Sequence, residues 1–93
     1  MFWRKRRRPT GRHTLTIENK FDRALEIVIE ILWLRYVLQP GSEMEIDAET
    51  EGYPFETIVY PGGMTVFAGI DCEPKVRING IEVEPDYDTK IPE

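Results

Sequence analysis

The sequence predicts an all-β fold: a small antiparallel β-sandwich of seven to eight strands with a flexible basic N-terminal arm. Segments in which apolar and polar residues alternate recur about every 8–12 residues, a spacing typical of sandwiches and small barrels. Turn-forming Pro-Gly and Asn-Gly pairs lie between these segments. The chain has 93 residues, of which 41% are apolar and 11% aromatic, enough for one core and not for two. We expect a disordered basic arm over 1–12, a sandwich domain over 13–88 and a frayed C-terminus over 89–93.

Each expected strand places apolar residues at alternate positions, which gives a strand one buried and one solvated face. The segments with this pattern are 13–18, 24–31, 35–38, 43–48, 55–60, 64–68, 75–78 and 81–84. Asn79-Gly80 is the clearest turn, because a type I′ hairpin turn needs a positive φ at both central residues. Pro40-Gly41 and Pro61-Gly62-Gly63 indicate two further turns.

The segment 24–38 is open to a second interpretation. Its β-branched, alternating first half favours a hairpin with a bend near 32–34 and a return strand over 35–38. A helix over 22–38 is the alternative, because an i, i+3, i+4 stripe also runs through Leu25, Val28, Ile29, Leu32 and Tyr36. A helix here would make the fold α+β.

The charges are separated along the chain. Residues 1–12 contain six cations and no acid, whereas residues 13–93 contain six cations and 17 acids, a net charge of −11. Nucleic acid is a candidate partner for the arm, through phosphate contacts and base stacking. An anionic membrane surface is a further candidate partner, and so is the acidic face of its own or a neighbouring chain. The remaining alternative is that the arm has no specific role. The arm residues expected to bind are Trp3, Arg4, Lys5, Arg6, Arg7 and Arg8.

An acidic run follows the first of the Pro-Gly turns. Glu43, Glu45 and Asp47 lie at i, i+2 and i+4, so on a strand they share one face, and Glu49 and Glu51 continue the run. One interpretation is a solvated face that discourages edge-to-edge aggregation. The other is a docking surface for a basic partner. A calcium site would need about 6–8 converging oxygens, and no loop here matches one.

The bend of the expected hairpin is unusually apolar. Leu32, Trp33 and Leu34 offer more apolar surface than a turn requires. These side chains either fill the core or form an exposed patch for homodimerisation or partner docking.

The residues that carry most enzyme chemistry are scarce. The chain has one histidine, His13, one serine, Ser42, and one cysteine, Cys72. These cannot supply a zinc site of about four ligands, and acidic neighbours on both sides of Cys72 disfavour a reactive thiolate. No cofactor motif is present, so we expect no enzyme, no metal, no cofactor and no small-molecule substrate. A single cysteine and the lack of a long apolar run favour a cytoplasmic location.

Four short motifs resemble a family of small uncharacterised bacterial β-sandwich proteins. They are LTIEN at 15–19, LEIVIE at 25–30, YVLQPG at 36–41 and GMTVF at 63–67. The resemblance implies a compact β-sandwich and no known activity, and it transfers no catalytic residue. The bend at 31–34 departs from the family's pattern, because it lacks the Pro and Gly that the family has at this bend.

These patterns together point to association rather than chemistry. We expect a non-enzymatic interaction or adaptor module, with an acidic body that docks a protein partner and a basic arm that attaches to a polyanion such as nucleic acid. An inhibitor that occupies a basic site through the acidic strand face is one alternative. A carboxylate-based enzyme or metal-binding protein is another.

Overall fold

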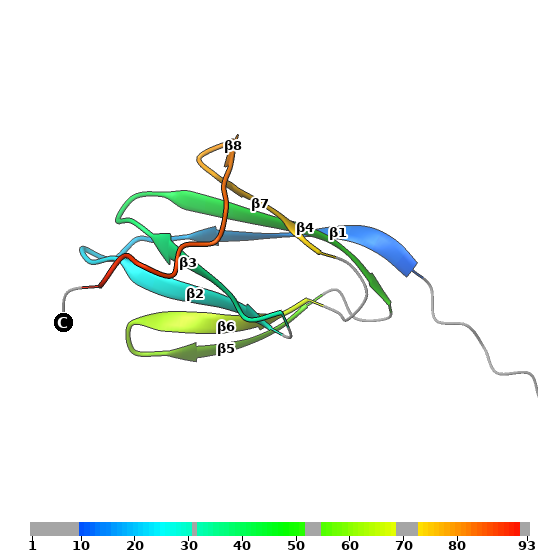
Figure 1. Ribbon diagram of the computed structural model, residues 1–93, viewed down its shortest axis with the longest axis horizontal. Helices are drawn as coiled ribbons and strands as arrows, with labels where there is room; N and C mark the ends of the chain where they lie inside the picture. Colours follow the sequence, from blue (N-terminus) through cyan, green and yellow to red (C-terminus); the bar gives the residue numbers. More distant parts are fainter. Residues whose placement is uncertain (1–9, 31, 52–54, 69–72, 92–93) are drawn as a thin grey trace, which may run out of the picture.

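The computed structural model describes residues 10–30, 32–51, 55–68 and 73–91, which fold as a β-sandwich of eight strands (Figure 1). This confirms the all-β prediction. The strands are β1 (Thr10–Glu18), β2 (Leu25–Glu30), β3 (Leu34–Leu38), β4 (Glu43–Glu51), β5 (Glu56–Tyr60), β6 (Gly63–Phe67), β7 (Lys75–Ile78) and β8 (Ile81–Glu82).

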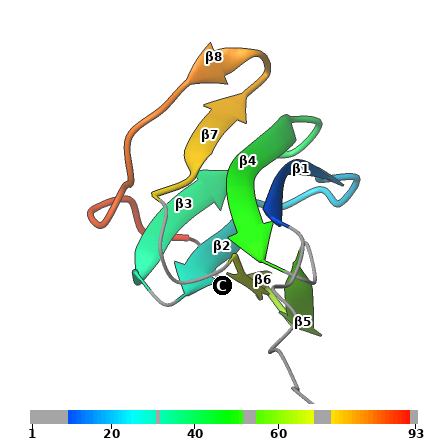
Figure 2. The ribbon, with the colours of Figure 1, turned by 90° about the vertical axis from the view of Figure 1, so that its right-hand side faces the viewer.

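The two sheets have four strands each, in the orders β1-β4-β7-β8 and β3-β2-β6-β5, and they form separate layers when viewed along the strands (Figure 2). The hairpin expected over 24–38 is confirmed, and the alternative of a helix over 22–38 is wrong. β2 and β3 pair from Leu25 with Leu38 to Ile29 with Leu34. All pairs are antiparallel except β2 with β6. Parallel neighbours need a long connection, and here β3, β4 and β5 supply it.

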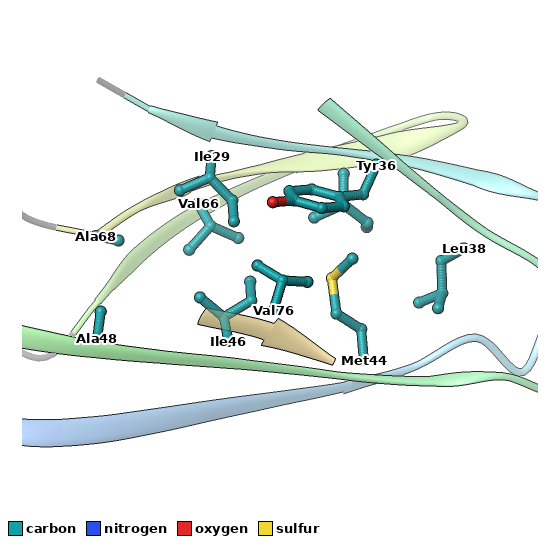
Figure 3. Close-up of a cluster of buried hydrophobic side chains, with 10 residues drawn as sticks. Ile29, Tyr36, Leu38, Met44, Ile46, Ala48, Val66, Ala68 and Val76 are labelled. Atoms are coloured by element: carbon teal, nitrogen blue, oxygen red, sulfur yellow. The ribbon is translucent and has the colours of Figure 1, made fainter. Parts of the chain in front are cut away.

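The core lies between the inner faces of the two sheets (Figure 3). Alternate residues of β2 and β4 supply half of the ten residues in this cluster, and Ile27, Ile29, Met44 and Ile46 among them are almost fully buried. Burial of each such side chain stabilises the fold by about 1.5–3 kcal/mol. The full cluster consists of Ile27, Ile29, Tyr36, Leu38, Met44, Ile46, Ala48, Val66, Ala68 and Val76.

The first sheet is longer than the sequence pattern indicated. β1 begins at Thr10, opposite Glu51, and continues through Arg12, opposite Glu49. Residues 10–12, which we assigned to the arm, therefore belong to the sandwich. The acids after Ala48, which lie beyond the strand expected over 43–48, extend β4, because the start of β1 pairs with them along the backbone.

The Asn79-Gly80 turn has the expected conformation. Asn79 has φ 52° and Gly80 has φ 81°, as a type I′ turn between β7 and β8 requires. The turn also contacts the start of β4. The Asn79 N–H donates to the Glu43 carbonyl at 2.8 Å, the Glu43 N–H donates to Asn79 Oδ1 at 3.0 Å, and Asn79 Nδ2 lies 3.2 Å from Ser42 Oγ.

Candidate interaction surfaces

The acidic face of β4 is partly neutralised by cations from its neighbouring strands. Arg12 Nε of β1 lies 3.3 Å from Asp47 Oδ1. On the other side, Arg77 Nη2 of β7 lies 3.7 Å from Glu45 Oε2 and 3.9 Å from Asp47 Oδ2. The centre of this face is therefore a mosaic of both signs. The linear sequence concealed this, because no base lies within residues 43–56.

The remaining acids of this run lie toward the ends of β4. Glu43, at its start, is exposed and lies opposite Glu18, whose carboxylate is 3.6 Å from Lys20 Nζ. Glu49 is also exposed, and Glu51 ends the strand opposite Thr10. The acidic face is thus shorter than a five-residue anionic row.

The apolar bend presents Trp33 to solvent. Its side chain is 66% exposed and that of Leu32 is 45% exposed, whereas Leu34 packs against the core. The three residues we grouped as one patch therefore divide into two exposed side chains and one that faces inward.

Trp33 is held in an unfavourable backbone conformation. Its φ of 61° lies in the left-handed region, where a bulky L-residue is rare. The Trp33 carbonyl accepts a hydrogen bond from the Tyr87 hydroxyl at 3.1 Å, so the C-terminal segment contacts the bend. Strain of this kind persists only where surrounding contacts hold it.

The C-terminal segment is itself tied to β3. The Asp86 N–H donates to the Arg35 carbonyl at 2.8 Å, and Arg35 Nη1 donates to the Asp86 carbonyl at 3.0 Å. Arg35 Nε also pairs with Glu26 Oε2 at 2.6 Å. Hydrogen bonds from Thr89, followed by that from the Asp88 N–H, lower the pKa of Asp86. The Asp86 side chain therefore closes a turn over residues 86–89, which includes only the first residue of the segment 89–93 that we expected to fray.

A third surface was missed by the sequence analysis. All five side chains of β5 are exposed, and three of them are apolar or aromatic: Ile58, Val59 and Tyr60. The strand itself was predicted, but its position at the edge of a sheet was not. The available signal was charge, because Glu56 is the only charged residue between 55 and 68.

The described residues do not bring His13 and Ser42 together. His13 pairs with Ala48 in the middle of the β1–β4 ladder, whereas Ser42 lies beyond the Glu18–Glu43 end of that ladder. Glu18 lies five residue steps after His13 along β1, which corresponds to about 17 Å at roughly 3.3–3.4 Å per step. Cys72 lies outside the described residues, as do Trp3 and the cations from Arg4 to Arg8.

Open hollows are present on the described surface, and two of them are formed by residues named in this section. One of about 530 Å³ is lined by Glu18, Asn19, Lys20, Phe21, Gly41, Ser42 and Glu43. One of about 740 Å³ lies beside the Arg35–Glu26 ion pair and the C-terminal turn. Within the described ranges no group of three or more His, Cys, Asp and Glu residues is placed to hold a metal ion. No helix in the same part of the chain is long and apolar enough to cross a membrane.

Comparisons of this chain with family models, with curated proteins and with solved structures found no match.

Proposed function

We propose that this protein is a non-enzymatic interaction module of the cytoplasm, whose sandwich docks a partner protein through the bend at Trp33. In the same proposal, the basic arm adds electrostatic attraction to a polyanion such as nucleic acid. The observation that carries the docking role is the exposed Trp33 side chain on a constrained bend.

Tryptophan is one of the side chains enriched among residues that dominate binding energy, together with tyrosine and arginine. An exposed indole on a constrained loop loses little conformational entropy on binding, because the strand pair and the Tyr87 hydrogen bond already order the backbone. Leu32 and Tyr87 extend the apolar surface beside it, and both are exposed.

The inhibitor alternative has less support. It requires an anionic face with few cations of its own, because a basic partner must compete with any internal ion pair. Arg12 and Arg77 already lie beside Asp47 and Glu45. Exposed ion pairs contribute little to stability, about 0–1 kcal/mol, so a partner could still displace them. A partner that docks at the Trp33 bend does not have to displace an internal ion pair.

The proposal is tested by photo-crosslinking in cells with a benzophenone amino acid in place of Trp33. Phe21 is the matched control, because it is an aromatic residue with the same 66% exposure in a different loop. We expect a discrete adduct from position 33 and none from position 21. The Trp33→Ser variant should fold normally and, when the photoprobe is moved to Leu32, should lose the same adduct.

Two results would reject the docking role. One is the lack of a discrete adduct from position 33. The other is an identical set of adducts from positions 33 and 21, which would indicate contact without specificity.

A further inference from the structure

The free edge of β5 differs from the other three sheet edges in the described residues. The C-terminal segment covers the β3 edge through the Asp86–Arg35 hydrogen bonds. β8 is only two residues long. The outer face of β1 carries exposed charges, Arg12 and Glu18. Natural sheets protect their edges in just such ways, whereas β5 has a single charge, Glu56 at its first residue, and the four exposed residues after it are uncharged.

Both faces of β5 are apolar and open. Ile58 and Tyr60 lie on the outer face of the sheet, where the Tyr60 hydroxyl is 3.3 Å from Thr65 Oγ. Val59 lies on the core side, opposite Met64, yet it is 74% exposed. An edge strand with apolar residues on both faces is well suited to pair with another strand.

The charge distribution selects the partner. The body is strongly acidic, so two copies repel one another over most of their surface. The β5–β6 hairpin is the exception, since Glu56 is its only charge. The edge of β5 is therefore the part of the acidic body at which a second copy of the same chain meets the least repulsion.

We propose that two copies associate by antiparallel pairing of β5 with β5 about a two-fold axis at Ile58. In this register Ile58 faces the partner subunit's Ile58, Thr57 faces Val59 of the partner subunit, and Glu56 faces Tyr60 of the partner subunit. No like charges oppose each other, and the central pairs are β-branched, which stabilises cross-strand contacts. The β3-β2-β6-β5 sheet of one copy and the same sheet of the other copy would become one continuous sheet of eight strands.

The contact is small. A five-residue strand pair with its flanking side chains falls below the roughly 1,200 Å² of a stable interface. Dimerisation should therefore be weak and depend on concentration, and sedimentation equilibrium from micromolar to millimolar protein is the suitable measurement. This inference does not depend on the Trp33 bend, so Trp33→Ser should leave the dimer intact.

Charge substitutions at position 58 test the register. Ile58→Lys and Ile58→Glu should each give a monomer, because the two-fold axis places like charges opposite each other. An equimolar mixture of the two variants should recover a dimer, because Lys then faces Glu. Ile81→Lys is the matched control, since Ile81 is 69% exposed at the edge of the other sheet, and it should dimerise like the wild type.

A disulfide variant provides a second test that adds no charge. Ile58→Cys in a Cys72→Ser background should form a covalent dimer on mild oxidation, because directly opposed residues lie about 4.5–5.5 Å apart at Cα, within disulfide reach. Ile81→Cys in the same background should not. A wild type that stays monomeric at millimolar concentration would overturn the proposal. So would dimers of both charge variants as strong as the wild type, or equal cross-linking at positions 58 and 81.

Discussion

Asn19 is the one buried polar residue in the described part of the chain, with 1% of its surface exposed. Its side chain is fully engaged: Nδ2 donates to the Arg23 carbonyl at 2.8 Å and to the Leu38 carbonyl at 2.9 Å, while Oδ1 accepts from the Phe21 N–H at 2.9 Å. Its backbone bonds to Ser42 and Gly41. This residue thus joins the end of β1, the following loop, the end of β3 and the Pro40-Gly41 turn.

We expect Asn19→Ala to lower the free energy of unfolding by about 2–4 kcal/mol, because the substitution leaves the buried Leu38 carbonyl without its donor and removes the part-buried bonds to the Arg23 carbonyl and the Phe21 N–H. Urea unfolding followed by circular dichroism measures the change. Lys20→Ala is the control, since its side chain is 85% exposed, and it should stay within about 0.5 kcal/mol of the wild type. Equal effects from the two substitutions would show that the Asn19 hydrogen bonds do not stabilise the fold.

Tyr36 makes stability depend on alkaline pH. Burial, followed by the neighbouring Tyr87 and acidic groups, raises the pKa of Tyr36 from 10.0 to about 12. The folded state therefore keeps the phenol proton that the unfolded chain loses. Its contribution is complete below pH 10, declines as pH rises from 10 to about 12, and amounts to at most about 3 kcal/mol. Urea unfolding across this range should show the decline in the wild type. Tyr36→Phe should lack this component, whereas Tyr60→Phe should retain it.

At the scale of elements, local patterns predicted the strands and their turns, because alternation and turn chemistry act over a few residues. They predicted the 24–38 hairpin and the positive φ of Asn79 and Gly80. They could not predict the parallel β2–β6 pair, because alternation gives a strand no direction and no neighbour. For the same reason β5 was found as a strand but not as an edge, so its exposed residues went unnoticed as a surface.

At Gly63 the parallel pair of β2 and β6 has no room for a larger side chain. A Cβ at this position would collide with the backbone carbonyl of Glu26 in β2. Gly63→Ala should therefore push β6 away from β2 and lower the free energy of unfolding by about 2–3 kcal/mol. Gly11→Ala is the matched strand control, because its nearest atom, His13 Nε2, would lie at an ordinary 3.6 Å. Chemical denaturation of both variants measures the difference, and a Gly63→Ala protein as stable as the Gly11→Ala protein would contradict the close approach.

At the scale of the whole molecule, the cations and the acids lie farther apart along the sequence than they do in the folded structure. The alternation correctly placed Glu45 and Asp47 on one face of β4, but their cations arrive from Arg12 and Arg77 on neighbouring strands. Cross-strand partners of this kind depend on sheet order, which no local pattern reveals. Arg12 consequently counts with the sandwich, and the arm keeps the five consecutive cations from Arg4 to Arg8.

The boundary at Thr10 sharpens the test of the arm. Deletion of residues 1–9 removes those cations and leaves β1 whole, whereas deletion of residues 1–12 would also remove the Arg12–Asp47 pair. If the arm contacts DNA phosphates, the logarithm of the duplex affinity should fall with the logarithm of salt at a slope of about −4 to −5, since each neutralised phosphate contributes about −0.9. The 1–9 deletion should abolish this binding, because the remaining body is acidic and repels a polyanion.

Replacement of the five arm cations by serine should abolish binding in the same way. Removal of Phe2 and Trp3 alone should leave the salt slope of duplex binding unchanged. It should weaken only the binding of single strands, whose bases stack on aromatic rings. A slope that survives deletion of residues 1–9 would place the phosphate contacts on the sandwich and rule out this role for the arm.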